Sequence, residues 1–242
     1  MDWHARYLQQ ANWTRDLREY LFHQAGLDNA RRVLEVGCGT GAILRELETA
    51  ASIHGLDLNP DSLAECRIHT PNVTLTCANG LALPYPNQTF DITYCHYFLL
   101  WVHDPLQALR EMKRVTRQEG HILALAEPDY FARVDQPDKL KILGEWQRES
   151  LKSQGADPGF GARLAETFFQ AGIKIRETGT IQRARKDPTA TDREMEWAVI
   201  ETDLAESVSD EEIQKMKRID EQAWQQGKRV LDVPTYFVWG QI

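Results

Sequence analysis

The sequence predicts an α/β fold in which a mostly parallel sheet carries helices on both faces. Short apolar runs alternate with amphipathic helical patterns between about residues 32 and 127. Such alternation is typical of parallel strands joined by helices. A second observation is that the first apolar run ends in three alternate glycines, Gly37, Gly39 and Gly41. A strand, a glycine turn and a helical pattern in that order begin a βαβ unit that holds a nucleotide-like ligand.

The elements follow from the spacing of apolar residues and from the breakers between them. Aromatic residues and leucines at spacings near 3, 4 and 7 predict a helix over residues 3–26, which Gly26 ends. Asn59-Pro60 and Asp104-Pro105 are polar caps followed by proline, so each predicts a helix start. We expect strands at 32–37, 52–58, 73–78, 90–96 and 121–127, and helices at 41–49, 60–69 and 104–117.

The pattern changes after Pro128. Two helices are expected at 138–154 and 160–171, followed by a strand of mixed polarity between residues 173 and 181. The acidic stretch 189–226 is helical in pattern, and Tyr236-Phe237-Val238-Trp239 predicts a closing strand.

Composition excludes several classes of protein. A chain of 242 residues, 42% hydrophobic, can bury a sizeable core, and its net charge of −8 argues against a general binder of nucleic acid or membrane surfaces. The four cysteines have no CxxC spacing, which predicts free thiols in a reducing compartment. The N-terminus lacks the apolar core of a signal peptide, and no apolar run approaches the roughly 20 residues of a membrane span. We therefore expect a cytoplasmic protein.

The glycine loop alone leaves two cofactor classes open. Gly37-x-Gly39-x-x-Ala42 fits the dinucleotide-binding pattern, and Asp57, 20 residues after Gly37, lies where dehydrogenases bind a ribose with an acid. Glu35 argues for the other class. It lies two residues before the first glycine, where dinucleotide folds normally carry an apolar residue.

Four segments carry a resemblance to a known family. In chain order they are LEVGCGTG (34–41), HGLDLNP (54–60), CANGLALPYPNQTFDITYCHYFLLWV (77–102) and LREMKRVTRQEGHILALAEPDY (109–130). Together they resemble the motifs of class I methyltransferases that depend on S-adenosyl-L-methionine (SAM), of the small-molecule type. The resemblance implies a Rossmann-like sheet of seven strands, with the last strand, 235–240, inserted antiparallel. It also implies SAM as methyl donor and S-adenosyl-L-homocysteine as product.

The resemblance also implies a division of the chain into three parts. We expect an N-terminal helical cover over residues 1–29 and a Rossmann-like methyltransferase domain over 30–186 and 233–242. Residues 187–232 would form a helical cap between the last two strands.

Carried onto this sequence, the family pattern implies a cofactor site. Glu35 would bind the ammonium group of SAM or cap backbone N–H groups, and Asp57 would bind the ribose hydroxyls or lie in a solvated turn. Leu58 would cover the adenine. Asn79-Gly80 replaces the usual Asp-Ala pair and would either bind the adenine edge or form a simple turn. The expected cofactor-binding residues are Tyr7, Glu35, Gly37, Cys38, Gly39, Gly41, Asp57, Leu58, Asn79, Gly80, Cys95, His96 and Leu100.

Two residues are candidates for catalysis. His96 follows the fourth strand and could be a base, a substrate contact or a packed histidine. Glu127, with Asp129, lies at the carboxyl end of the fifth strand, where it could orient a substrate, accept its proton or cap a loop. These two acids lack a third convergent oxygen ligand, so no metal is expected.

The resemblance implies transfer of a methyl group to an O, N or C atom of a small molecule in a closed pocket. The expected partner is a small-molecule acceptor, with no nucleic acid and no membrane, in a monomer or homodimer. Two alternatives stay open: a SAM-binding protein without methyltransferase activity, such as a pericyclase-like or regulatory relative, and an NAD-dependent oxidoreductase. Aromatic residues of the expected covers either line the pocket or pack between helices; they are Tyr7, Trp13, Tyr20, Phe22, Trp197 and Trp224.

Overall fold

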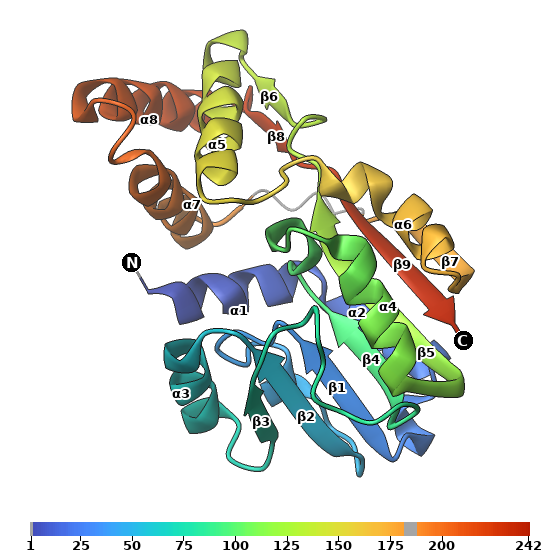
Figure 1. Ribbon diagram of the computed structural model, residues 1–242. Coiled ribbons are helices and arrows are strands. Elements are labelled where there is room, and N and C mark those ends of the chain that lie inside the picture. Colours follow the sequence, from blue (N-terminus) through green and yellow to red (C-terminus); the bar gives the residue numbers. More distant parts are fainter. Residues whose placement is uncertain (1, 182–187) are drawn as a thin grey trace.

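A seven-stranded sheet forms the centre of the molecule (Figure 1), for which a computed structural model describes residues 2–181 and 188–242. Its strand order is β3-β2-β1-β4-β5-β9-β7. The strands are β1 (Arg32–Val36), β2 (Ser52–Asp57), β3 (Thr74–Cys77), β4 (Phe90–Cys95), β5 (Thr116–Pro128), β7 (Lys174–Thr180) and β9 (Thr235–Gln241). A separate pair joins β6 (Val134–Gln136) and β8 (Val230–Asp232).

Helices cover the sheet and extend beyond one of its edges. They are α1 (Trp3–Trp13), α2 (Arg15–Gln24), α3 (Pro60–His69), α4 (Pro105–Val115), α5 (Lys141–Ser153), α6 (Leu164–Gln170), α7 (Ala190–Leu204) and α8 (Asp210–Gln225). Among the residues described, no helix is long and apolar enough to cross a membrane.

The predicted fold class is confirmed. Strands β1 to β5 pair in parallel, and β9 lies between β5 and β7, antiparallel to both. The strand order reverses between β1 and β4, which is the position where open α/β sheets bind their ligands. The helix predicted over residues 3–26 is two helices separated at Thr14, where the backbone leaves the helical conformation (φ −111°, ψ 4°).

The α-helix predicted over residues 41–49 is wrong. The structure has only a short 3₁₀ turn, Leu44–Glu46, and the backbone is extended again at Leu47. Residues 41–44 are all buried, whereas a surface helix buries only one face of each turn. This segment therefore winds irregularly into the core, and the loop after β1 offers turn amides in place of a helix N-terminus.

Alternate residues of the strands pack on the two faces of the sheet. Leu34 and Val36 of β1 join a core with residues of α4 and α6. Val33 faces the other way and joins a core that includes Leu21 and Phe22 of α2. The N-terminal helices therefore cover one face, and α4 and α6 cover the other (Figure 1).

Helices α5, α7 and α8 share a smaller core beyond the sheet edge (Figure 1). Leu143 of α5 packs there with Trp197 and Ile200 of α7 and Ile213 of α8. Helix α5 thus packs with the two helices of the predicted cap. The predicted boundary at 186/187 lies outside the described residues, so the three-part division of the chain stays a prediction.

A buried ion network holds this smaller core to the β6–β8 pair. The guanidinium group of Arg229 bonds to the carboxylates of Asp220 and Asp135, and Asp135 also pairs with Arg133. The indole N–H of Trp197 donates to Asp220 at 2.9 Å. The side chains of Arg229 and Asp135 are only 1% and 2% exposed, so their charges depend on one another for compensation.

Replacing Arg229 should therefore destabilise the protein strongly. The Arg229→Met substitution leaves the buried Asp220 without its cation and leaves Asp135 with Arg133 alone, so it should cost about 3–5 kcal/mol, measured by urea unfolding. Arg163→Met is the control, because the Arg163–Asp157 pair is 56% and 41% exposed and should contribute less than about 1 kcal/mol. Equal losses in the two variants would contradict this interpretation.

Candidate active site

The loop after β1 is folded against the end of β2. The N–H groups of Gly37 and Cys38 both donate to the carbonyl of Leu56, at 2.8 and 3.0 Å. Gly37 has φ of +76°, and a Cβ there would lie 2.4 Å from the ring of Phe98. Only glycine satisfies both constraints. The loop therefore keeps its backbone at the carboxyl edge of the sheet.

Asp57, the predicted ribose-binding acid, lies directly against this loop. Its Oδ2 accepts the N–H of Gly39 at 2.8 Å, and its Oδ1 accepts the N–H of Asn59 at 2.9 Å. Each carboxylate oxygen keeps a further acceptor site. The structure thus brings together the acid and the glycine loop that the sequence paired.

Tyr7 and Leu58 flank the same place. The Tyr7 ring lies over the loop, because a Cβ on Gly39 would meet its Cε2 at 3.5 Å. Burial, and then the charge of Asp57, raise the pKa of Tyr7. Leu58 is 68% exposed, which leaves an apolar side chain uncovered beside the carboxylate.

Asn79 and Gly80 form a turn, one of the two alternatives that the sequence left open. Asn79 Oδ1 accepts the N–H of Leu81 at 2.9 Å. A Cβ on Gly80 would lie 2.7 Å from the ring of Phe98. The alanine usual in the resembled family would collide here, so Phe98 explains why this chain has glycine.

Glu35 is buried at 2% exposure and accepts a hydrogen bond from the hydroxyl of Tyr94 at 3.0 Å. The two residues are register partners on β1 and β4. Burial raises the pKa of Glu35 well above its usual value, and the bond from Tyr94 opposes that rise. Among the described residues its hydrogen-bond donor is a side chain, and the choice between binding an ammonium group and capping backbone N–H groups stays a prediction.

His96 is held by the N-terminal helices. Its Nε2 lies 3.0 Å from Thr14 Oγ1, which also accepts a bond from Arg18 at 2.6 Å. Arg18 in turn pairs with Glu46, after the glycine loop. Burial, and then the charge of Arg18, lower the pKa of His96 to about 3. The imidazole is therefore neutral and a weak base at physiological pH.

Glu127 is fully enclosed by the protein. It is 0% exposed, and its two oxygens accept the N–H groups of Phe98, Leu99 and Leu100 at 3.0, 2.8 and 3.1 Å. Burial raises its pKa to about 7, against these bonds. Asp129 likewise caps a turn through the N–H of Phe131 at 2.9 Å. The three bonds to backbone amides of a short turn favour the loop-cap alternative, and a catalytic role for Glu127 stays a prediction.

The side chains of three other predicted cofactor residues are buried. Cys38, Cys95 and Leu100 are 5%, 0% and 3% exposed. At Gly41 a Cβ would lie 2.6 Å from Cys66 Sγ. These four positions shape the loop and the core, and a ligand could reach them through backbone atoms alone.

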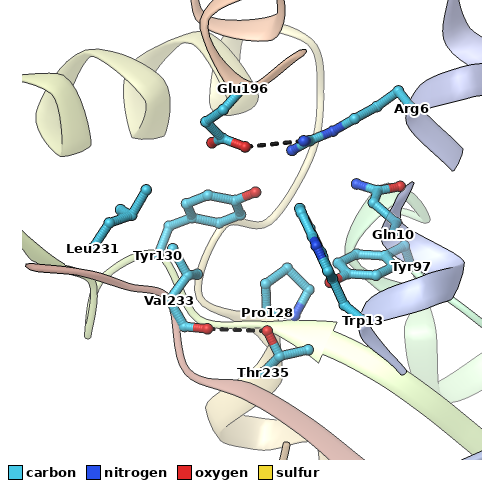
Figure 2. Close-up of a pocket in the computed structure, with 10 residues that line it drawn as sticks. All are labelled: Arg6, Gln10, Trp13, Tyr97, Pro128, Tyr130, Glu196, Leu231, Val233 and Thr235. Carbon is cyan, nitrogen blue, oxygen red and sulfur yellow. Dashed lines mark hydrogen bonds and ion pairs between the residues drawn. The ribbon is translucent and has the colours of Figure 1, made fainter. Parts of the chain in front are cut away.

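A cavity of about 30 Å³ lies between the N-terminal helix and the cap (Figure 2). Arg6 of α1 pairs across it with Glu196 of α7 at 2.9 Å. The guanidinium group also lies over the Trp13 ring, 4.9 Å from its centroid. Tyr130 extends toward Glu196 (Figure 2), and burial raises the pKa of Tyr130 to about 12. The lining residues are Arg6, Gln10, Trp13, Tyr97, Pro128, Tyr130, Glu196, Leu231, Val233 and Thr235.

Tyr97 connects this cavity to the strand ends. It follows His96, its ring meets the His96 ring edge-on at 4.8 Å, and its backbone has φ of +50°. A non-glycine residue rarely adopts this left-handed conformation, which clusters at functional sites. The cavity therefore adjoins the end of β4, beside the expected cofactor site.

Sequence reasoning missed Arg6, Thr14, Arg18 and Glu196. For the first three, the available signal was a charged or hydroxyl side chain within the helix predicted over residues 3–26, and this signal named no partner. Among the expected aromatic lining residues, Trp13 lines the cavity. Phe22 instead packs edge-on against Tyr94, Trp197 lies in the core of the cap, and Tyr20 is 45% exposed.

Comparisons with known proteins agree with this geometry. A family model described as a methyltransferase domain matches residues 34–124. The chain is 30% identical over 194 residues to demethylmenaquinone methyltransferase of Shouchella clausii, covering 69% of this chain and 78% of that one. It is 38% identical over 165 residues to a malonyl-[acyl-carrier protein] O-methyltransferase of Halorhodospira halophila, covering 64% of this chain and 54% of the relative, so it spans about half of that protein.

The solved structure of the [4+2]-cyclase SpnF has the same fold, with a TM-score of 0.61 at 20% identity, over 93% of this chain and 79% of the other. At this identity the likeness concerns the fold alone. The family match, the relatives and the strand order lead to one conclusion: the chain belongs to the class I SAM-dependent methyltransferases.

Proposed function

We propose that this chain transfers the methyl group of SAM to an O, N or C atom of a small molecule. The observation that carries the proposal is the hydrogen bond between Gly39 and Asp57, which fixes the glycine loop against the acid that we propose binds the ribose. The cavity lined by Arg6, Trp13 and Tyr130 adjoins this place and would form one wall of the acceptor's binding site.

The residues present fit the cofactor. Asp57 would accept the ribose hydroxyls, and the exposed Leu58 would cover the adenine beside Asn79 and Gly80. Glu35 is a buried carboxylate with one hydrogen bond among the described residues. Such a group is costly without a cation, so an ammonium group would stabilise its charged form. Tyr7 would close the loop from the side of α1.

When bound, SAM supplies a methyl group already activated on a sulfonium. The protein's residues then have to position the acceptor in line with the sulfur–methyl bond and exclude water. Helices α1 and α7 serve that purpose, because Arg6 and Glu196 join them across the cavity. Their paired charges cancel, which suits a small molecule that offers both donors and acceptors.

The named relatives suggest the first acceptors to test. One acts on a malonyl group of a carrier protein and another on demethylmenaquinone. A malonyl thioester and a quinol analogue should be incubated with labelled SAM, and formation of S-adenosyl-L-homocysteine should be followed.

A second function has a specific observation in its favour. The two residues predicted as acid–base groups are a neutral, weakly basic His96 and a fully buried Glu127. A SAM-binding protein that does not transfer the methyl group needs no base. It would bind SAM tightly and yield no S-adenosyl-L-homocysteine with any acceptor, which separates it from the first proposal.

The Asp57→Ala substitution should weaken SAM binding at least tenfold, which corresponds to about 1.4 kcal/mol, because it removes the ribose acceptors. Isothermal titration calorimetry with SAM and with S-adenosyl-L-homocysteine measures the loss. Asp138→Ala is the control, since that aspartate is 84% exposed on another part of the chain. Unchanged affinity in Asp57→Ala would refute the ribose assignment.

The Arg6→Met substitution should affect the acceptor and spare the cofactor. It leaves Glu196 without this cation in the cavity, so kcat/KM for the acceptor should fall about tenfold or more, while the Kd for SAM should change by less than about twofold. Arg110→Met, an exposed position on α4, is the control. A parallel loss of SAM affinity would place Arg6 in the cofactor site instead.

The pKa of His96, lowered to about 3, predicts no ionisation of this residue at physiological pH. The pH profiles of kcat/KM for the wild type and His96→Asn should therefore run parallel between about pH 5 and pH 8. A wild-type limb near the ordinary histidine pKa of about 6.5 that His96→Asn lacks would instead show a titrating base.

A further inference from the structure

Three potential metal ligands from two helices meet on the side of the glycine loop away from the cavity. His4 lies in the first turn of α1, and Glu65 and His69 lie four residues apart on α3. That spacing puts Glu65 and His69 on the same helix face, with Glu65 Oε1 4.0 Å from His69 Nε2. One ligand atom from each of the three residues lies within 4.8 Å of the others.

His4 offers an unused nitrogen at this place. Its side chain is buried at 9% exposure, and its Nδ1 lies 2.7 Å from the hydroxyl of Thr40. Its Nε2 is buried and has no hydrogen-bond partner among the described residues. An unsatisfied buried nitrogen is costly and uncommon, so its presence points to a ligand.

We propose that His4, Glu65 and His69 bind a divalent transition metal such as Zn²⁺. Two imidazoles and one carboxylate are a zinc donor set, in which water takes the fourth position. The bond from His4 Nδ1 to Thr40 matches the second contact that metal-bound histidines usually make, which fixes the ring and leaves the other nitrogen for the metal. The inference is independent of the proposed function.

Binding requires one ring to turn. The His4 and His69 rings are stacked, with centroids 3.8 Å apart and planes inclined by 6°. The lone pair of each ring nitrogen lies in the plane of its own ring, so two stacked rings do not point their lone pairs at one metal ion. Thr40 holds His4, but the His69 side chain is 30% exposed and ends α3, so His69 is the ring free to turn. The carboxylates of Asp2 and Glu65 favour a cation beside His4, and the guanidinium group of Arg45 opposes it.

The position of the site gives the metal a structural role. Thr40 lies between two glycines of the loop that contacts Asp57, and His4 belongs to the helix that carries Tyr7 over that loop. A metal shared by α1 and α3 would hold the N-terminal helix against the core and fix the loop.

Zinc and cobalt titrations of the untagged chain test the proposal. The wild type should bind about one equivalent of Zn²⁺ by calorimetry, and Co²⁺ should give the visible bands of a tetrahedral site. The His4→Ala, His69→Ala and Glu65→Gln substitutions should each lower the affinity about tenfold or more. His103→Ala, an exposed histidine before α4, should bind as the wild type does.

Two outcomes would overturn the proposal: a wild type that binds no Zn²⁺ at micromolar concentration, or His4→Ala and Glu65→Gln variants that bind it unchanged. Glu65→Gln guards against misfolding, because its side chain is 42% exposed and its loss removes no core packing. Thermal unfolding supplies a second readout, in which Zn²⁺ should raise the Tm of the wild type and of His103→Ala more than that of Glu65→Gln.

Discussion

The place of β1 at the reversal of strand order is the constraint on which the rest of the site depends. β1 pairs in parallel with β2 on one side and β4 on the other, so three carboxyl ends meet at one edge of the sheet. Asp57 then reaches the glycine loop from β2, and Tyr94 reaches Glu35 from β4. Any residue that ends one of these strands is near the others whatever its distance in the chain, which is why ligands of open α/β sheets bind there.

The N-terminal helices add a second set of contacts to the site at the strand ends. Arg18 joins Thr14 to Glu46, and Thr14 in turn fixes His96 at the end of β4. One buried guanidinium group therefore ties the cover to both the loop after β1 and the segment after β4. The same charge helps burial keep His96 neutral. The N-terminal helices therefore contribute charge to the site and also enclose it.

The part of the site that could be predicted from the sequence is the part that lies at the ends of the predicted strands. Gly37, Gly39 and Asp57 follow apolar runs, and parallel pairing brings such strand ends together, so their proximity could be predicted from the sequence. The pair Arg6–Glu196 joins residues 190 positions apart on two helices, and periodicity cannot state which helices face one another.

The helix predicted over residues 41–49 was wrong because consecutive apolar residues there are buried on all sides, which a helical pattern does not distinguish from an irregular segment in the core. Glu127 stayed ambiguous because its three amide partners are set by backbone turns. The acids considered as metal ligands from the sequence, Glu127 and Asp129, lie at the carboxyl end of β5. His4 and His69 come together only because α1 lies against α3.

The groups around the cavity limit what chemistry the protein itself can supply under the proposed function. His96 is neutral and weakly basic, burial raises the pKa of Tyr130 to about 12, and Glu196 is paired with Arg6. None of these three is suited to take a proton at neutral pH in the arrangement described. The sulfonium of SAM needs no such help when the acceptor already carries a lone pair, as a carboxylate does. Rate enhancement would then come from alignment of the acceptor and exclusion of water, and alignment alone can supply about 7–11 kcal/mol of the barrier. Catalysis would therefore depend on how firmly α1 and α7 enclose the acceptor. The Arg6–Glu196 pair is a contact that joins these two helices.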